Sequence, residues 1–99
     1  MPYEIGYSPA AEENLQGLTA RQRTTILDSV DRQLTHEPNV ETRNRKPMRP
    51  NPIAPWELRV GILRVYYDIE EQPEPRVTVL AVGRKLRNRV VVGDEEIEI

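Results

Sequence analysis

The chain has 99 residues, a formal charge of −2 and 37% hydrophobic residues, which suits a single domain, residues 1–99, with a thin core and a shallow surface site. The absence of cysteine excludes disulfides, thiolate metal sites and cysteine nucleophiles, and the single histidine, His36, disfavours a histidine metal site. No apolar run is long enough to span a membrane and the first residues lack the pattern of a signal peptide. We therefore expect a cytoplasmic protein with no membrane partner and no bound metal.

The first third of the chain predicts one strand followed by two helices. Tyr3 to Tyr7 alternate in polarity as a half-buried strand does, and Ser8 before a proline is typical of a helix N-cap. The first helix is expected from Pro9 to about Gln16. Thr19 and Gln22 have the spacing of a capping box, so a second helix is expected to start there. The buried stripe of this second helix is expected to comprise Ile26, Leu27, Val30 and Leu34.

The stretch from Thr35 to Pro55 has no regular period, because its five prolines interrupt helix and strand patterns over most of its length. We expect a long loop, with His36 as a solvated turn residue. A solvated linker and a functional loop are both compatible with this composition. The functional interpretation rests on four bases, which are Arg43, Arg45, Lys46 and Arg49.

From Trp56 the period changes to two, which predicts a β-hairpin that turns at Gly61. Its apolar face carries Trp56, Leu58, Val60, Leu63, Val65 and Tyr67. Val77 to Val82 form a further apolar strand, and Val90 to Val92 a short last one. The expected fold is α+β in the order β-α-α-β-β-β, with room for a short extra strand at the edge. A two-helix hairpin is expected to pack on one face of a small antiparallel sheet.

The bases of the chain are concentrated in two segments. Residues 43–64 contain six bases and one acid, and residues 84–89 contain four bases and no acid, which leaves a net +9 there and −11 elsewhere. In an antiparallel meander, the face opposite the helices is shared by Glu57, Arg59, Arg64 and Tyr66. Such a face suits an RNA backbone, although charges on a sheet face are also commonly solvated or paired with each other.

Several motifs carry a resemblance that covers essentially the whole chain. They are Trp-Glu-Leu-Arg-Val-Gly-x-x-Arg-Val-x-Tyr-Asp-Ile at 56–69, Val-Gly-x-Lys-x-x-Asn at 82–88, Gly-Asp-Glu-Glu-Ile at 93–97, and Tyr-Ser-Pro-x-Ala-Glu near residue 7. The sequence resembles the RelE/ParE superfamily of toxins from type II toxin-antitoxin systems, in which plasmid stabilisation proteins are found. The helical hairpin on a small antiparallel sheet agrees with the fold of that family.

The resemblance implies the toxin half of such a pair and leaves three functions open. RelE-like members are metal-independent, ribosome-dependent messenger-RNA endoribonucleases that inhibit translation. In their reaction the RNA 2′-hydroxyl attacks the adjacent phosphate and gives a 2′,3′-cyclic phosphate. ParE-like members inhibit DNA gyrase without nuclease activity, and a degenerate, non-toxic member would only bind its antitoxin. The implied partners are a cognate antitoxin and the ribosome with its mRNA, or else DNA gyrase, and no cofactor is implied.

The resemblance also assigns residues. Arg64 would stabilise the phosphate, Arg59 and Lys85 occupy basic positions of the site, and Glu57 stands where several relatives have a base. RelE-like nucleases commonly have a tyrosine near the C-terminus, and the aligned position here is Val91, with no tyrosine or histidine after Tyr67. The remaining candidates for RNA or phosphate binding are Arg43, Arg45, Lys46, Arg49, Arg84, Arg87 and Arg89.

Overall fold

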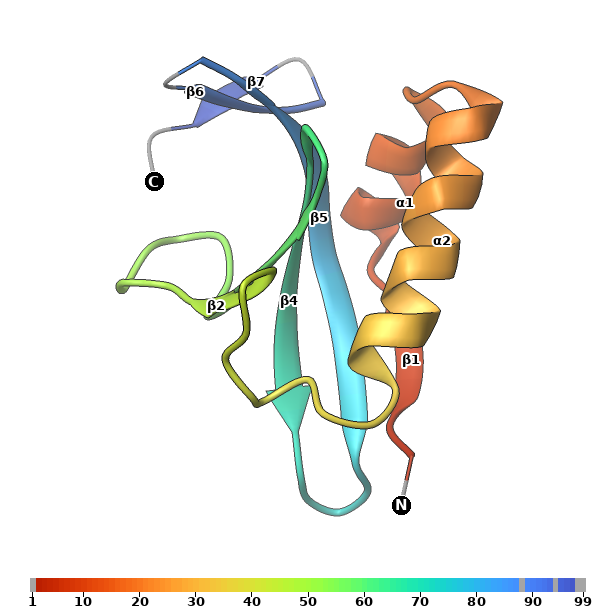
Figure 1. The fold of residues 1–99 in the computed structure, drawn as a ribbon, viewed down its shortest axis with the longest axis vertical. Coiled ribbons are helices and arrows are strands. Elements are labelled where there is room, and N and C mark those ends of the chain that lie inside the picture. The colour runs from red at the N-terminus through yellow and green to blue at the C-terminus, as the bar shows by residue number, and fades with distance from the viewer. Residues whose placement is uncertain (1, 88, 94, 98–99) are drawn as a thin grey trace.

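The computed structural model describes residues 2–87, 89–93 and 95–97, so the motif positions Asn88 and Asp94 lie outside the described residues. Figure 1 shows two helices on one side of the sheet, and β2 and the β6–β7 hairpin on the other side. Within the described residues, no helix has the length and apolar character needed to cross a bilayer. The elements in chain order are β1 (Glu4–Tyr7), α1 (Pro9–Gln16), α2 (Ala20–Leu34), β2 (Arg45–Pro47), β3 (Trp56–Val60), β4 (Leu63–Glu70), β5 (Arg76–Leu86), β6 (Arg89–Val92) and β7 (Glu95–Ile97).

The described residues form one sheet of seven strands, in the order β2-β3-β4-β5-β6-β7, with β1 also beside β5. The pairs along this path are antiparallel, whereas β1 and β5 are parallel. β1 and β6 share one edge of β5, because β1 pairs with its first part and β6 with its last part. The expected α+β fold is confirmed. It has two strands that were not expected, β2 and β7, and one parallel pair in an otherwise antiparallel sheet.

Both helices begin where the sequence predicts. The Ser8 hydroxyl accepts a hydrogen bond from the first turn of α1 at 3.1 Å, and Thr19 and Gln22 form a reciprocal capping box at the start of α2. The prediction for Leu27 is wrong, because its side chain is 45% exposed. It lies about 100° around the helix from the preceding residue, on the flank of the stripe. The rest of the predicted stripe is buried against the sheet, namely Ile26, Val30 and Leu34.

The segment 35–55 contains a strand that the sequence did not predict. Arg45–Pro47 pair with β3, and a proline is tolerated there because β2 is an edge strand. After β2, the Asn51 side chain shapes a turn by accepting hydrogen bonds from two backbone N–H groups at 2.8 and 3.1 Å. This turn packs Ala54 against Tyr66 and Ala81 in a second apolar cluster. The sheet face opposite the helices is therefore partly covered by this turn.

β5 and β6 approach each other closely at Gly83, which belongs to the Val-Gly motif of the sequence. A Cβ atom at this position would lie 2.6 Å from the carbonyl oxygen of Val91 and 2.8 Å from Cγ2 of Val92. Side-chain carbons do not approach other atoms so closely, so only glycine fits without a shift of β6. The contact holds the C-terminal hairpin beside β5, on the side of the sheet where β2 also lies (Figure 1).

Candidate functional site

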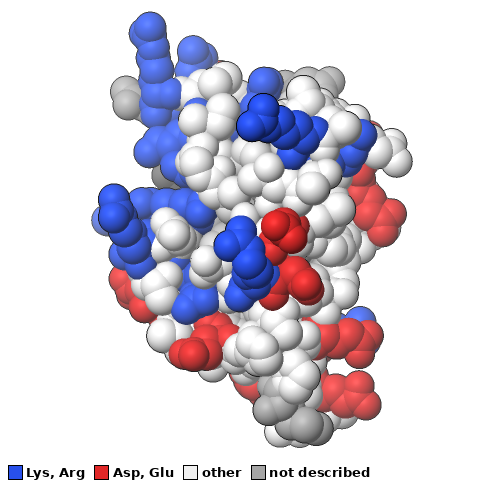
Figure 2. Space-filling view, turned by 45° about the vertical axis from the view of Figure 1, so that its right-hand side comes forward, with Lys and Arg blue, Asp and Glu red and all other residues white. Residues whose placement is uncertain are grey.

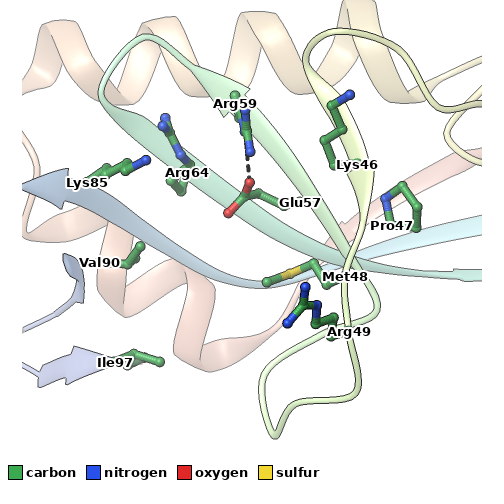
Figure 3. A pocket seen from close by; sticks show the side chains of 10 residues that line it. All are labelled: Lys46, Pro47, Met48, Arg49, Glu57, Arg59, Arg64, Lys85, Val90 and Ile97. Carbon is green, nitrogen blue, oxygen red and sulfur yellow. Dashed lines mark hydrogen bonds and ion pairs between the residues drawn. The ribbon is translucent and has the colours of Figure 1, made fainter. Parts of the chain in front are cut away.

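A groove lies on the sheet face away from the helices, between β2 with its following loop and the C-terminal hairpin (Figure 3). Its volume is about 480 Å³, and every strand from β2 to β7 contributes to its wall. All four predicted catalytic residues line it, together with two of the predicted phosphate-binding residues. The lining residues are Lys46, Pro47, Met48, Arg49, Glu57, Arg59, Arg64, Lys85, Val90 and Ile97.

The charge of the groove is strongly positive, since its lining has five bases and one carboxylate. The wider surface is polarised as the sequence indicated. In Figure 2 most Lys and Arg side chains gather over the upper and left part of the molecule, and most Asp and Glu side chains over the right and lower part. A concave surface lined by one sign of charge focuses the electrostatic potential and raises the local concentration of the opposite charge. The groove therefore favours a polyanion such as a nucleic-acid backbone.

Strand pairing brings the charged side chains of β3 and β4 together. Arg59 is directly opposite Arg64, and Glu57 is directly opposite Tyr66. Because side chains alternate between the faces of a sheet, all four lie on the face away from the helices. Two like charges directly opposite each other repel, so the arginine pair favours an anion that bridges the two guanidinium groups.

Arg64 is the most enclosed of the groove's bases, with 8% of its surface exposed. Its Nη1 atom donates to the carbonyl oxygens of Gly61 at 2.7 Å and Leu63 at 2.9 Å. Within the described chain, neither Nε nor Nη2 of Arg64 donates to a protein acceptor. The hairpin turn thus orients the guanidinium group and leaves donors for a phosphate, which arginine binds with two N–H groups at once.

Glu57 is paired with Arg59 in the free protein. Its Oε1 atom accepts a hydrogen bond from Arg59 Nε at 3.0 Å. The Glu57 side chain is only 12% exposed, whereas that of Arg59 is 47% exposed. Arg59 has room to turn toward a ligand, and the carboxylate stays at the floor of the groove (Figure 3).

Tyr66 is a neighbour of this pair for which the sequence suggested a face but no role. Its side chain is fully buried in the second apolar cluster. Among the described residues, its hydroxyl is the buried side-chain polar atom that lacks a hydrogen-bond partner. Burial, and after it the charge of Glu57, raises the pKa of Tyr66 well above its usual range, so the hydroxyl keeps its proton. A large aromatic residue on the polar face of the hairpin was the signal that this face is partly buried.

Five of the predicted phosphate-binding bases do not line the groove. The Arg45 guanidinium ties the segment after α2 to the helix end, because Nη1 donates to the carbonyl of Gln33 at 2.6 Å and Nε to that of Val40 at 3.0 Å. Arg84 lines a depression beside α1 on the other face of the sheet. Arg89 pairs with Glu96 at 3.1 Å. The five residues outside the groove are Arg43, Arg45, Arg84, Arg87 and Arg89.

Val91, the position aligned with the tyrosine of RelE-like nucleases, does not face the groove. It lines the depression beside α1, whereas Val90 lines the groove. A shift of one residue changes the face, because the side-chain period of a strand is two. The Val91 side chain is therefore not part of the groove, and the groove position on β6, Val90, is aliphatic as well.

The groove combines three chemical capacities. Its arginines can bind and stabilise a phosphate, the Glu57 carboxylate can accept a proton, and the Lys85 ammonium can donate one. In the described part of the chain, no group of three or more His, Cys, Asp and Glu side chains is arranged to hold a metal. His36 is exposed in the bend after α2, as expected of a turn residue.

The chain thus has a helical hairpin on one face of a curved, mainly antiparallel sheet and a cationic groove on the other face. A chain in the crystal structure of the toxin-antitoxin complex RelBE2 from Mycobacterium tuberculosis shares this fold with a TM-score of 0.71. The match covers 86% of this chain and 100% of that chain, with 24% sequence identity. No protein-family model and no curated protein matches the sequence. The RelE/ParE-like fold that the motifs implied is confirmed by this likeness.

Proposed function

We propose that this chain, as one domain of residues 1–99, is the toxin of a type II toxin-antitoxin system and cleaves messenger RNA on the ribosome in the cytoplasm. The observation that carries this proposal is the convergence of Glu57, Arg59, Arg64 and Lys85 in one cationic groove. The fold shared with a chain of a toxin-antitoxin complex supports it. An antitoxin is the expected partner, and a segment of it that neutralises the groove would hold the toxin inactive.

The proposed reaction uses the RNA's own 2′-hydroxyl as the nucleophile. Its oxygen forms a bond to the adjacent phosphorus while its proton passes to the Glu57 carboxylate. The bond from phosphorus to the 5′-oxygen breaks, and that oxygen takes a proton from the Lys85 ammonium. Arg64 and Arg59 stabilise the additional negative charge on the phosphorane, and the product carries a 2′,3′-cyclic phosphate. No metal is needed in this scheme.

Inhibition of DNA gyrase without nuclease activity is the second candidate function. The C-terminal wall of the groove favours it, since Val90 and Ile97 are aliphatic and offer no aromatic ring to stack on a base. A degenerate member that only binds its antitoxin would share this feature.

Cleavage and gyrase inhibition are separated by inducing the wild type and measuring transcript ends, translation and DNA supercoiling in parallel. Ribosome-phased cuts that fall by about 10²–10³-fold in Arg64→Ala would support the nuclease, because one donor to the charged intermediate typically contributes that much. Arg64→Lys tests whether the bidentate guanidinium is needed. Arg21→Ala removes an exposed arginine of α2, on the helical side of the sheet, and should leave the cuts unchanged. Intact transcripts with blocked supercoiling would instead establish gyrase inhibition, and neither effect would indicate a non-toxic member.

A further inference from the structure

Glu57, which lines the groove, and Tyr66, which is buried on the neighbouring strand, form an unusual combination. Glu57 and Tyr66 are directly opposite each other on β3 and β4. The Glu57 side chain is 12% exposed and has Arg59 as its partner at 3.0 Å. The Tyr66 side chain is fully buried, and its hydroxyl has no partner among the described residues. A nearly buried carboxylate and an unused hydrogen-bond donor therefore lie side by side.

Packing alone does not explain the hydroxyl of Tyr66. Its ring packs against Ala54 and Ala81, and a phenylalanine ring would fill the same space. A buried polar atom without a partner is costly and rare in folded proteins. Burial, followed by the Glu57 charge, raises the pKa of Tyr66, so its hydroxyl is a proton-bearing donor throughout the physiological range.

We propose that Tyr66 is a positioning residue for Glu57, and that its hydroxyl becomes the carboxylate's hydrogen-bond donor when a bound phosphate draws Arg59 away. This inference rests on the proposed function, since Glu57 is the proton acceptor of that reaction. The ion pair between Glu57 and Arg59 is then the arrangement of the free protein, before a phosphate binds. An incoming phosphate competes for Arg59 with the carboxylate, and the exchange of partners prepares both groups for the reaction at once.

The other charged groups around Glu57 already have partners or lie toward the ligand. Lys46, directly opposite Glu57 on β2, pairs with Glu41 at 3.3 Å. Arg64 on β4 is held through Nη1 by two carbonyl oxygens of the hairpin turn. The charged groups that line the groove around Glu57 are Lys46, Arg49, Arg59, Arg64 and Lys85, and Tyr66 lies directly opposite Glu57 on β4. The Tyr66 side chain is fully buried and uncharged, so its hydroxyl can stay with the carboxylate while the bases bind phosphate.

The role of this donor follows from desolvation. A carboxylate with as little exposed surface as that of Glu57 favours the protonated, neutral form once it has lost its arginine. In that form Glu57 could not accept the proton of the 2′-hydroxyl. A hydrogen bond from Tyr66 favours the ionised form and orients the second oxygen toward the nucleophile. Tyr66 keeps its own proton throughout, and the proton from the RNA ends on Glu57.

The first test is the pH dependence of ribosome-dependent cleavage by Tyr66→Phe. We expect the acidic limb of the kcat profile to move up by about one pH unit, so that kcat below the limb falls about tenfold, with KM and the rate at high pH unchanged. Tyr67→Phe is the matched control, because it removes a hydroxyl from the neighbouring residue on the helical face, where it bonds to the carbonyl of Pro38. A Tyr66→Phe profile that coincides with the wild-type profile would overturn the proposal.

A second test needs no cleavage and separates this inference from the proposed function. Arg59→Ala removes the resting partner, and the double variant Arg59→Ala/Tyr66→Phe removes both partners. We expect the carboxyl carbon of Glu57, followed by NMR, to titrate about one pH unit higher in the double variant than in Arg59→Ala. If the wild type does not cleave RNA and this difference is found, the nuclease proposal fails while the role of Tyr66 stands. Equal midpoints in the two variants would refute the role of Tyr66 whether or not the protein cleaves RNA.

Discussion

Replacement of Gly83 by alanine tests how the C-terminal wall of the groove is held in place. The new Cβ atom would meet the Val91 carbonyl oxygen at 2.6 Å and Val92 Cγ2 at 2.8 Å, so β6 must move by several tenths of an ångström. Overpacking of this kind costs about 1–3 kcal/mol, and the lower entropy of the unfolded alanine chain offsets about 0.4–1 kcal/mol of that cost. We expect Gly83→Ala to lower the free energy of unfolding by about 1–2 kcal/mol.

The assay is urea denaturation at neutral pH, with thermal melting as a second measurement. For a domain of this size, 1 kcal/mol corresponds to a Tm shift of roughly 4–8 °C. Because β6 carries Val90 into the groove, we also expect weaker RNA binding by the folded variant. Gly83→Ala/Val92→Ala should recover only part of the stability, since the contact with the Val91 carbonyl oxygen is closer and belongs to the backbone.

The control for this prediction is Gly6→Ala in β1. A Cβ atom at Gly6 would meet nothing within 4 Å, so this substitution should be neutral or stabilising by up to about 1 kcal/mol. The reasoning is refuted if Gly83→Ala is as stable as Gly6→Ala. Full recovery in the double variant would show that the side chain of Val92, and not the backbone of β6, sets the requirement for glycine.

Three further predictions concern stability. Tyr67→Phe loses a 2.8 Å hydrogen bond to a buried carbonyl oxygen and should lower the free energy of unfolding by about 1–3 kcal/mol in urea denaturation. Tyr66→Phe loses no hydrogen bond to a described residue and should leave that free energy unchanged or raise it. Equal losses of stability in the two variants would contradict this contrast. Arg45→Ala removes hydrogen bonds to two backbone carbonyls and should speed amide hydrogen exchange in segment 38–47. Unchanged exchange together with weaker RNA binding would instead indicate that Arg45 binds phosphate. Burial, and after it the negative charge of Asp31, raises the pKa of Tyr7 from 10.0 to about 12. Because the tyrosine of the unfolded state ionises at lower pH than that of the folded state, the free energy of unfolding should fall between pH 10 and 12. Tyr7→Phe should reduce this alkaline loss, and an identical loss in the variant would show that other groups cause it.

Local signals predicted the elements that depend on nearby residues. The N-caps at Ser8 and Thr19 and the hairpin from Trp56 lie where the sequence placed them, because capping and strand alternation are set within a few positions. The same signals failed for Arg45–Pro47. Five prolines indicated a loop, but pairing with β3 gives this short edge strand its hydrogen bonds. The parallel neighbour of β5 was equally hidden, since Glu4 and Arg76 are distant in sequence.

The candidate site divides in the same way. The sequence by itself placed Glu57, Arg59 and Arg64 on one face of a hairpin, since a period of two determines which side chains lie together on paired strands. Only the tertiary structure decided which other bases join them. Strand pairing and the close contact at Gly83 bring distant segments over one face, so the groove is also lined by Lys46, Arg49 and Lys85. The Arg45 guanidinium instead donates a hydrogen bond to the backbone carbonyl of Gln33. The structure alone also showed that Tyr66 is buried beside Glu57 with no hydrogen-bond partner among the described residues, because burial depends on the turn around Ala54, which no local pattern predicts.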